Sequence, residues 1–308
     1  MWTPPGLIVT FNPSPDFFAR LDSFYAQLEQ IVLVDNGSNL QVRQQLRREA
    51  QNRASSLHVI FNEINLGIAT ALNQGFCWAI EQSYDHIVAF DQDSQPNSGM
   101  IAAMLDVFSS HSEDGKLAVV APVVIDSQVN IQARYLRPKG KLLFERAICG
   151  GNVLENVTYV ITSGSLFDLA AYRKIGPFRD DFFIDYVDTE YCLRAKQCGY
   201  RIVVACKAEL DHRQGDRQKR VFWGSDYYPT FHSPLRWYFF GRNRIPMLRQ
   251  YALKFPHWFL YELSASLYTL IKMLLFETQK TAKLRALFRG TVDGVRGHMG
   301  KMTDTVSE

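Results

Sequence analysis

The chain has 308 residues, of which 47% are hydrophobic and 21% are charged, and its formal net charge is +3. These values are typical of a soluble globular protein with a large core, built either as one domain with an appendage or as two domains. The five cysteines are odd in number and include no Cys-x-x-Cys step, which argues against a disulfide framework and a zinc site and favours a reducing compartment. The first residues lack the basic start and long apolar stretch of a signal peptide, so we expect a protein on the cytoplasmic side.

Along the first 125 residues, short apolar runs alternate with segments that carry apolar residues at helical spacing. The runs that predict buried strands are Leu7–Phe11, Ile31–Val34, Leu57–Phe61, Ile87–Phe90 and Leu117–Val124. The helical segments are Asp16–Gln30, Leu40–Arg53, Ile68–Gln82 and Gly99–Ser110. This alternation implies right-handed crossovers, so we expect an α/β protein with a mainly parallel sheet and helices on both faces. Residues 126–156 show no steady period and are expected to form a loop or hairpin over the site.

The ends of the first two predicted strands carry polar residues suited to a nucleotide. The first ends in Thr10-Phe11-Asn12, without the Gly-x-Gly-x-x-Gly pattern of a dinucleotide dehydrogenase. The second ends in Asp35-Asn36-Gly37-Ser38, where an acid precedes a tight turn. Asp35 is placed to accept a hydrogen bond from the imide N–H of uracil or thymine. The alternative is a simple turn in which Asp35 caps the next helix.

Two carboxylates, Asp91 and Asp93, follow the fourth predicted strand and precede a Ser-Gln-Pro turn. Open α/β sheets bind ligands at the carboxyl ends of their strands. An Asp-x-Asp step there can hold Mg²⁺ or Mn²⁺ while phosphate oxygens complete the coordination shell, which points to a phosphorylated substrate. The alternative is a solvated, acidic turn.

Polar residues also mark two predicted helix starts. Asn65-Leu66-Gly67 precedes a helix that contains Asn73, and such an amino terminus suits an anion or a close nucleotide, although Asn65 is equally an N-cap candidate. Asp188 lies in the first turn of a second helix, where it is a candidate general base or a helix cap. Glu190 and Arg194 have the four-residue spacing of an ion pair on one helix face.

The last third of the chain is basic and aromatic. Phe255–Phe276 is apolar but is interrupted by His257, Glu262 and Lys272. We therefore expect it to lie against a membrane surface or the sheet domain rather than to span a bilayer. The next stretch carries the basic residues Lys280, Lys283, Arg285, Arg289 and Arg296. These two stretches suit either a helix at an anionic membrane surface or a helical pair packed on the sheet domain. We divide the chain into residues 1–230, which carry the sheet and the candidate site residues named above, and a helical region, residues 231–308.

Taken in chain order, these blocks resemble the family-two glycosyltransferases. The motifs that carry the resemblance are Val9-Thr10-Phe11-Asn12, Val34-Asp35-Asn36-Gly37-Ser38, Asn65-Leu66-Gly67, Asp91-Gln92-Asp93, Ser163-Gly164-Ser165, Asp188-Thr189-Glu190 and His212. The segments Phe90–Ser94, Ile184–Glu190 and Tyr238–Asn243 look most like bacterial rhamnosyltransferases that act on O-antigen chains or rhamnolipids. The resemblance implies an A-type glycosyltransferase fold followed by a helical carboxyl-terminal region.

It further implies an inverting, metal-dependent transfer of L-rhamnose from dTDP-β-L-rhamnose to a hydroxyl of a glycan or glycolipid. Asp188 matches the base position, and Asp93 with His212 would hold Mg²⁺ or Mn²⁺. The implied donor-binding residues are Thr10, Phe11, Asn12, Asp35, Asn36, Ser38, Asn65, Gly67, Asn73, Asp91, Gln92, Ser163, Gly164 and Arg242. Arg242 lies in an aromatic, basic stretch and would close over the diphosphate or meet a lipid-linked acceptor; a snorkelling helix residue is the alternative. The place of action would be the inner face of the cytoplasmic membrane, with peripheral contact to anionic lipid and none to nucleic acid.

Three alternatives stay open at this point. One is a glycosyltransferase of the same family that uses another donor, such as a UDP-sugar. The second is a phosphatase of the haloacid dehalogenase type, which also places Asp-x-Asp after a strand, although normally after the first strand of its fold. The third is a non-catalytic protein that binds nucleotide-sugars or glycans, which would need no general base.

Overall fold

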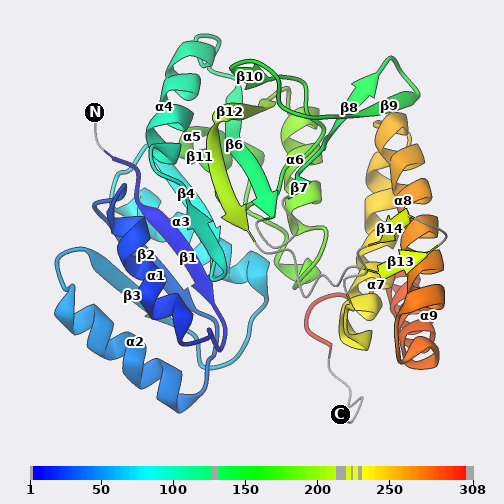
Figure 1. The fold of residues 1–308 in the computed structure, drawn as a ribbon, viewed down its shortest axis with the longest axis horizontal. Coiled ribbons are helices and arrows are strands. Elements are labelled where there is room, and N and C mark those ends of the chain that lie inside the picture. Colours follow the sequence, from blue (N-terminus) through cyan, green and yellow to red (C-terminus); the bar gives the residue numbers. More distant parts are fainter. Residues whose placement is uncertain (1–2, 127–130, 213–219, 223–224, 228–230, 303–308) are drawn as a thin grey trace.

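A mainly parallel sheet and the helices packed on it form the larger part of the molecule (Figure 1). The computed structural model describes residues 3–126, 131–212, 220–222, 225–227 and 231–302. The sheet consists of β1 (Gly6–Thr10), β2 (Ile31–Asp35), β3 (Leu57–Phe61), β4 (His86–Asp91), β5 (Ser94–Pro96), β6 (Leu117–Asp126), β7 (Ile131–Gln132), β10 (Val153–Leu154), β11 (Leu166–Asp168) and β12 (Arg201–His212). Its main path runs β10-β12-β6-β11-β4-β1-β2-β3, with β5 paired to β12 and β7 to β6.

The strand pairing confirms the expected α/β fold and adds antiparallel members. Strands β3, β2, β1 and β4 are parallel neighbours, and β6 is parallel to β12. Strand β11 runs antiparallel between β4 and β6, while β10 and β5 run antiparallel to β12. These added strands have two or three residues each, too few to show a period in the sequence.

Helices cover both faces of the sheet, as expected. They are α1 (Asp16–Tyr25), α2 (Leu40–Asn52), α3 (Ile68–Glu81), α4 (Met100–His111), α5 (Leu169–Ile175) and α6 (Val187–Gln197), with a short 3₁₀ turn at Asp180–Phe182. Side chains alternate across a strand, so Leu7 and Val9 of β1 join the cluster under α3 and α6. Ile8 points the other way, into the cluster under α1, α2 and α4.

Three long helices follow the sheet: α7 (Pro234–Tyr251), α8 (Pro256–Phe276) and α9 (Lys280–Arg296). Helices α7 and α9 pack with their backbones in contact. A Cβ at Gly290 would lie 2.0 Å from the Tyr238 carbonyl oxygen, and one at Gly241 would lie 2.4 Å from the Leu287 carbonyl oxygen. Glycine is therefore required at both positions. The predicted division at residue 230 and the end of the predicted helical region, residues 303–308, lie outside the described residues.

Helix α8 buries little of its surface. It is long and apolar enough to cross a membrane, yet only 6% of its apolar window is buried. The interrupting charged and polar groups have partners: Glu262 pairs with Arg244, and His257 Nε2 lies 3.1 Å from Thr158 Oγ1. Lys283, expected among the basic surface residues, is buried in an ion pair of 2.7 Å with Glu277. It is therefore unavailable to a membrane surface, since Glu277 at the end of α8 already neutralises it.

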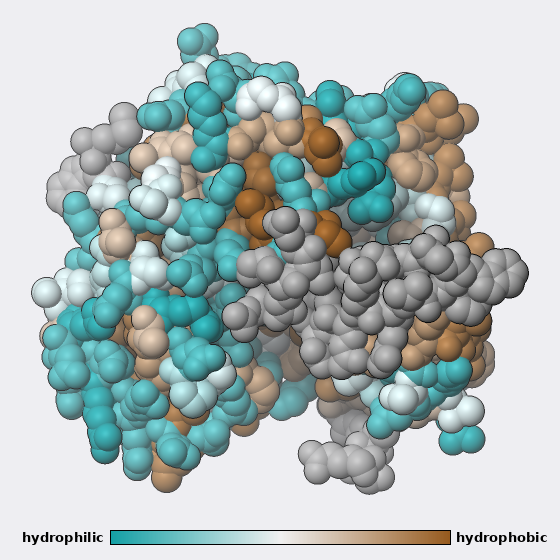
Figure 2. Space-filling model, in the orientation of Figure 1, coloured by the Kyte–Doolittle hydropathy of each residue, from teal (hydrophilic) through white to brown (hydrophobic). Residues whose placement is uncertain are grey.

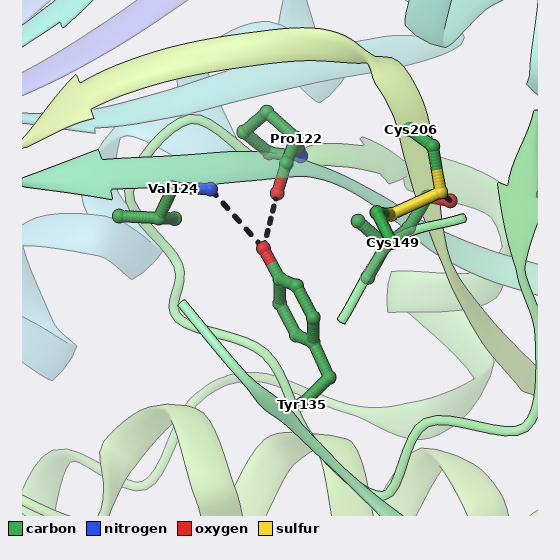
Figure 3. The surroundings of a disulfide bond; sticks show 6 residues. Pro122, Val124, Tyr135, Cys149 and Cys206 are labelled. Carbon is green, nitrogen blue, oxygen red and sulfur yellow. Dashed lines mark hydrogen bonds between the residues drawn. A yellow bond between two sulfur atoms is a disulfide. The ribbon is translucent and has the colours of Figure 1, made fainter. Parts of the chain in front are cut away.

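The segment predicted as a loop or hairpin, residues 126–156, contains the antiparallel pair β8 (Tyr135–Lys139) and β9 (Leu143–Ala147). Later in the chain, β13 (Arg220–Phe222) pairs antiparallel with β14 (Ser225–Tyr227). The β8–β9 hairpin packs against α8, not over the large cavity described below. Tyr135 ties it to β6: its hydroxyl donates to the Pro122 carbonyl oxygen (2.8 Å) and accepts from the Val124 N–H (3.1 Å), as Figure 3 shows.

Beside this tyrosine, Cys149 and Cys206 form a disulfide, with their Cα atoms 5.4 Å apart (Figure 3). The cysteine pattern argued against a disulfide framework, and the structure shows one disulfide that this pattern did not predict. The pairing of β10 with β12 brings these two cysteines together although they lie 57 positions apart in the sequence. Neither the odd number of cysteines nor their local spacing could predict this contact. Because the protein contains this disulfide, its cysteine content no longer favours a reducing compartment.

Candidate active site

A cavity of about 680 Å³ opens at the carboxyl ends of β1 and β4 and reaches the start of α6. This is the edge at which open α/β sheets bind ligands. The predicted site residues that line it are Thr10, Phe11, Asn36, Asn65, Gly67, Asp91, Gln92, Asp93, Ser163, Asp188 and His212. The fold thus gathers side chains from segments spread over about two hundred residues of sequence into one cavity.

Three of these residues form a possible metal centre. Ligand atoms of Asp91, Asp93 and His212 all lie within 4.8 Å of one another. His212 Nδ1 is 3.5 Å from Asp93 Oδ1, and His212 Nε2 is 3.9 Å from Asp91 Oδ2. The pairing of β5 with β12 causes this approach, because it sets Ser94 opposite His212. Two carboxylates and an imidazole are donors that a divalent cation accepts, so these residues fit one.

A chain of hydroxyl groups supports the acid pair and the histidine. Ser94 Oγ lies 2.8 Å from His212 Nδ1 and 2.6 Å from Ser163 Oγ, and Ser163 Oγ accepts the Asp91 N–H at 3.0 Å. Such outer contacts orient imidazoles that bind metals. Burial raises the pKa of Asp91, and a cation beside it would favour the ionised form.

Asp188 lies in the first turn of α6 and faces the cavity. The Thr162 hydroxyl donates a hydrogen bond to its Oδ1. Burial raises the pKa of Asp188 to about 6, while the hydrogen bond from Thr162 acts in the opposite direction. A carboxylate with this pKa is ionised at neutral pH and is still basic enough to accept a proton from a hydroxyl group. The predicted pairing of Glu190 with Arg194 is confirmed at 3.0 Å on the same helix.

Comparison with known sequences assigns the chain to a family. The sequence profile of Glycosyl transferase family 2 matches residues 7–176, more than half of the chain. The chain belongs to this family. It is therefore a glycosyltransferase, and the phosphatase and non-catalytic alternatives are wrong.

Known relatives agree with this assignment. The glycosyltransferase is 27% identical over 303 residues to the dTDP-rhamnosyl transferase RfbF of Shigella flexneri, covering 96% of both chains. Its fold resembles a structure of GalNAc-T7 with UDP, GalNAc and Mn²⁺ (TM-score 0.58, 14% identity, 87% of this chain and 58% of that one). It also resembles residues 1–349 of TarS from S. aureus (TM-score 0.58, 16% identity, 96% and 82%). The expected A-type glycosyltransferase fold is confirmed.

The loop before α6 has an unusual backbone in this glycosyltransferase. Phe183, Asp185 and Tyr186 all have a backbone φ of 63°, a conformation that residues other than glycine rarely adopt. Asn243 of α7 holds the loop: its Nδ2 lies 2.9, 2.7 and 3.0 Å from the carbonyl oxygens of Phe182, Ile184 and Asp185. Strained backbone persists where surrounding contacts fix it, and it clusters at functional sites.

Arg242 has a structural position and does not line the cavity. It is buried, and its guanidinium donates to the backbone carbonyl oxygens of Asp181, Phe182 and Gly300. The arginine of α7 that does line the cavity is Arg236, which the sequence interpretation missed. It pairs with Asp185 at 3.0 Å and retains 41% of its side-chain exposure. The only available signal was its place near the start of α7, six residues before Arg242.

Asn36, Asn65 and Gly67 form one network at the cavity wall. Asn36 Nδ2 donates to Asn65 Oδ1 and to the Gly67 carbonyl oxygen, both at 3.1 Å. Asn65 Oδ1 also accepts the Gly67 N–H at 2.9 Å. Gly67 has φ of +89°, and a Cβ there would lie 2.6 Å from the Phe183 carbonyl oxygen. Glycine at this position therefore lets the start of α3 meet the strained loop.

Three predicted residues lie just behind the cavity wall. Ser38 Oγ accepts the Asn12 N–H at 2.8 Å, and Asp35 Oδ2 accepts the Ser38 N–H at 3.3 Å. Asp35 is fully buried, and its Oδ1 has no hydrogen-bond partner in the described part of the chain. Asn39, not Asp35, caps α2 by accepting the Val42 N–H. Recognition of a base by Asp35 stays a prediction.

Asn73 and Gly164 are also outside the cavity lining. Asn73 Nδ2 donates to the Phe178 carbonyl oxygen at 2.9 Å and to Asp180 Oδ1 at 2.7 Å, so it joins α3 to the segment before α6. Gly164 adopts φ of +78° and donates its N–H to the Ala89 carbonyl oxygen. It shapes the turn that presents Ser163. Thr162, Asp185 and His232 line the cavity and were not predicted.

Proposed function

We propose that this glycosyltransferase moves L-rhamnose from dTDP-β-L-rhamnose to a hydroxyl of a glycan or glycolipid, with inversion at the anomeric carbon and dependence on Mg²⁺ or Mn²⁺. The observation that carries the donor is the similarity to RfbF, named a dTDP-rhamnosyl transferase, over 96% of both chains. A UDP-sugar is the alternative donor, since the GalNAc-T7 structure of the same fold contains UDP.

The cavity supports a direct displacement. Asp188 accepts the proton of the acceptor hydroxyl as its oxygen attacks the anomeric carbon. The bond to the nucleoside diphosphate breaks on the opposite face, through a transition state with oxocarbenium character. Negative charge grows on the leaving diphosphate, next to the Asp91, Asp93 and His212 cluster. The single displacement leaves the anomeric centre inverted.

A divalent cation, when bound by Asp93 and His212 with Asp91 beside them, would neutralise the diphosphate oxygens. Arg236 is the second source of positive charge at the cavity. Its guanidinium offers paired N–H donors that match phosphate oxygens, and its side chain is partly free to move. We assign to Arg236 the diphosphate role that the sequence suggested for Arg242.

We further propose that the reaction takes place at the inner face of the cytoplasmic membrane, with residues 1–230 as the catalytic part and residues 231–308 as the docking part. Support comes from α8, where large apolar side chains stay exposed (Figure 2, right-hand edge). Lys280, Arg285 and Arg296 are exposed on α9 and would meet anionic headgroups. Flotation with anionic but not with zwitterionic vesicles tests this placement.

Nucleotide release from a panel of dTDP-, UDP- and GDP-sugars tests the donor. The assay contains Mg²⁺ or EDTA and a bacterial membrane extract as the source of acceptor. We expect dTDP release from dTDP-rhamnose only, and only when both metal and extract are present. UDP release from a UDP-sugar, with dTDP-rhamnose left intact, would replace the donor and leave the family assignment unchanged.

A further inference from the structure

A second cavity, of about 460 Å³, lies among α7, α8 and the start of α6. It shares one wall residue, Tyr186, with the large cavity. In the first turn of α6, Asp188 lines the large cavity and the next residue, Thr189, lines the second one. The second cavity therefore begins within two residues of the candidate base.

The two charged side chains of this cavity pair with each other, whereas the buried Nε1 of Trp237 has no hydrogen-bond partner in the described part of the chain. Arg244 Nε lies 3.1 Å from Glu262 Oε1 and 3.2 Å from the Tyr186 hydroxyl. Glu262 Oε1 also accepts hydrogen bonds from Tyr186 and from Ser266. Because the two charges neutralise each other and have hydrogen-bond partners, the described residues of the lining leave no unpaired charge that would call for a charged ligand.

Apart from Thr189 and Thr269, the rest of the lining is apolar or aromatic. Trp237 and Phe240 come from α7, Leu263, Leu267 and Leu270 come from α8, and Leu287 comes from α9. Leu263 is 49% exposed and Leu267 is 60% exposed, so the cavity opens onto the bare apolar face of α8. The second cavity is polar at its inner end and apolar at its mouth. This distribution matches an amphiphilic ligand rather than a sugar chain or an anion.

We propose that the second cavity binds the hydrocarbon chain of an amphiphilic acceptor, whose hydroxyl-bearing end reaches Asp188 past Tyr186. This inference rests on the proposed glycosyl transfer and narrows its acceptor class. The two cavities are adjacent because both are lined by Tyr186, and this adjacency together with the open apolar mouth on α8 favours this occupant over a second copy of the protein. The hydrocarbon chain of the acceptor would enter from a lipid surface that contacts α8.

Alkyl β-D-glucopyranosides, titrated below their micelle concentration without any nucleotide-sugar, test chain binding directly by calorimetry. Each buried methylene strengthens binding about fourfold, so we expect the octyl compound, with two more methylenes, to bind about fifteenfold tighter than the hexyl compound. Leu267→Glu, inside the cavity mouth, should weaken octyl glucoside binding by at least about tenfold. Leu263→Glu should behave in the same way.

Leu275→Glu is the matched control, because Leu275 is 52% exposed on the same helix but does not line the cavity. It should change the affinity by less than about threefold. Equal losses in Leu267→Glu and Leu275→Glu would overturn the proposal, since they would mean adsorption on the outer face of α8. Equal binding of hexyl and octyl compounds, or a native dimer that octyl glucoside dissociates, would also overturn it. The titration contains no donor, so failure of the rhamnose assignment leaves its outcome unaffected.

Discussion

The Thr162 hydroxyl donates a hydrogen bond to the Asp188 carboxylate at the wall of the large cavity. This contact holds one carboxylate oxygen and leaves Asp188 oriented before any acceptor arrives. It also favours the ionised form of Asp188, against burial, which favours the neutral form. The balance of the two effects sets the pH range in which the base is active.

Activity is expected to depend on pH through Asp188. Its pKa of about 6 in the folded enzyme means that the base is protonated, and therefore inactive, at lower pH. The rate should fall about tenfold per pH unit below that value. Thr162→Val removes a hydrogen bond to the charged form, so its acid limb should lie at higher pH than that of the native enzyme. A native acid limb near pH 4, the ordinary range of an aspartate, would contradict the burial argument.

Nucleotide binding is expected to require a divalent cation held by Asp93 and His212. Asp93→Ala should weaken the metal-dependent binding of dTDP by at least about 10–100-fold, measured by calorimetry with Mn²⁺. Ser94→Ala keeps the three ligands and removes only the hydroxyl beside His212 Nδ1, so its loss should be smaller. If native enzyme binds dTDP equally well in EDTA and in Mn²⁺, the cluster has no role in donor binding.

Asn243 is expected to position the loop that precedes α6. Asn243→Ala removes three hydrogen bonds to that loop, and displacement of the base by about 1 Å should lower kcat by about 100-fold. Binding of dTDP, measured separately, should change little. Met247→Ala is the matched control, since Met247 is an apolar residue that is fully buried on the same helix. Equal losses of kcat in both variants would mean that Asn243 acts only through stability.

The disulfide is expected to stabilise the fold. Cys206→Ser should lower the free energy of unfolding of the oxidised protein by about 2–4 kcal/mol, measured by urea denaturation. Cys198→Ser, which changes an exposed free thiol, serves as the control and should have little effect. Addition of a reductant should lower the stability of the native protein to that of Cys206→Ser. No response to reductant would show that the bond contributes nothing.

Residues whose positions follow from strand ends could be predicted from the sequence. Asp91 and Asp93 follow β4, and the fold places His212 beside them at the end of β12. The alternation of strands and helices predicted β1 to β4 and β6 because each of these strands is mainly apolar. Short strands such as β11, Leu166–Asp168, carry too little pattern to be recognised.

Contacts that depend on tertiary packing were not predictable. Arg242 and Arg236 occur in the same basic, aromatic stretch, and only the placement of α7 decides that Arg236 lines the cavity while Arg242 is buried. The sequence predicted Lys283 as a surface cation, whereas in the structure it forms a buried ion pair with Glu277. Local sequence reports the charge of a side chain, but not the partner that a distant turn or helix brings to it.

The measurement that tests the account most directly is single-turnover transfer from dTDP-rhamnose by native enzyme and by Asp188→Asn, with donor affinity measured for both. The substitution keeps the size of the side chain and removes its basicity. We predict a rate loss of about 10²–10⁴-fold with donor affinity unchanged, because the base acts on the acceptor and not on the donor. An Asp188→Asn enzyme that transfers rhamnose at close to the native rate would contradict the proposed mechanism.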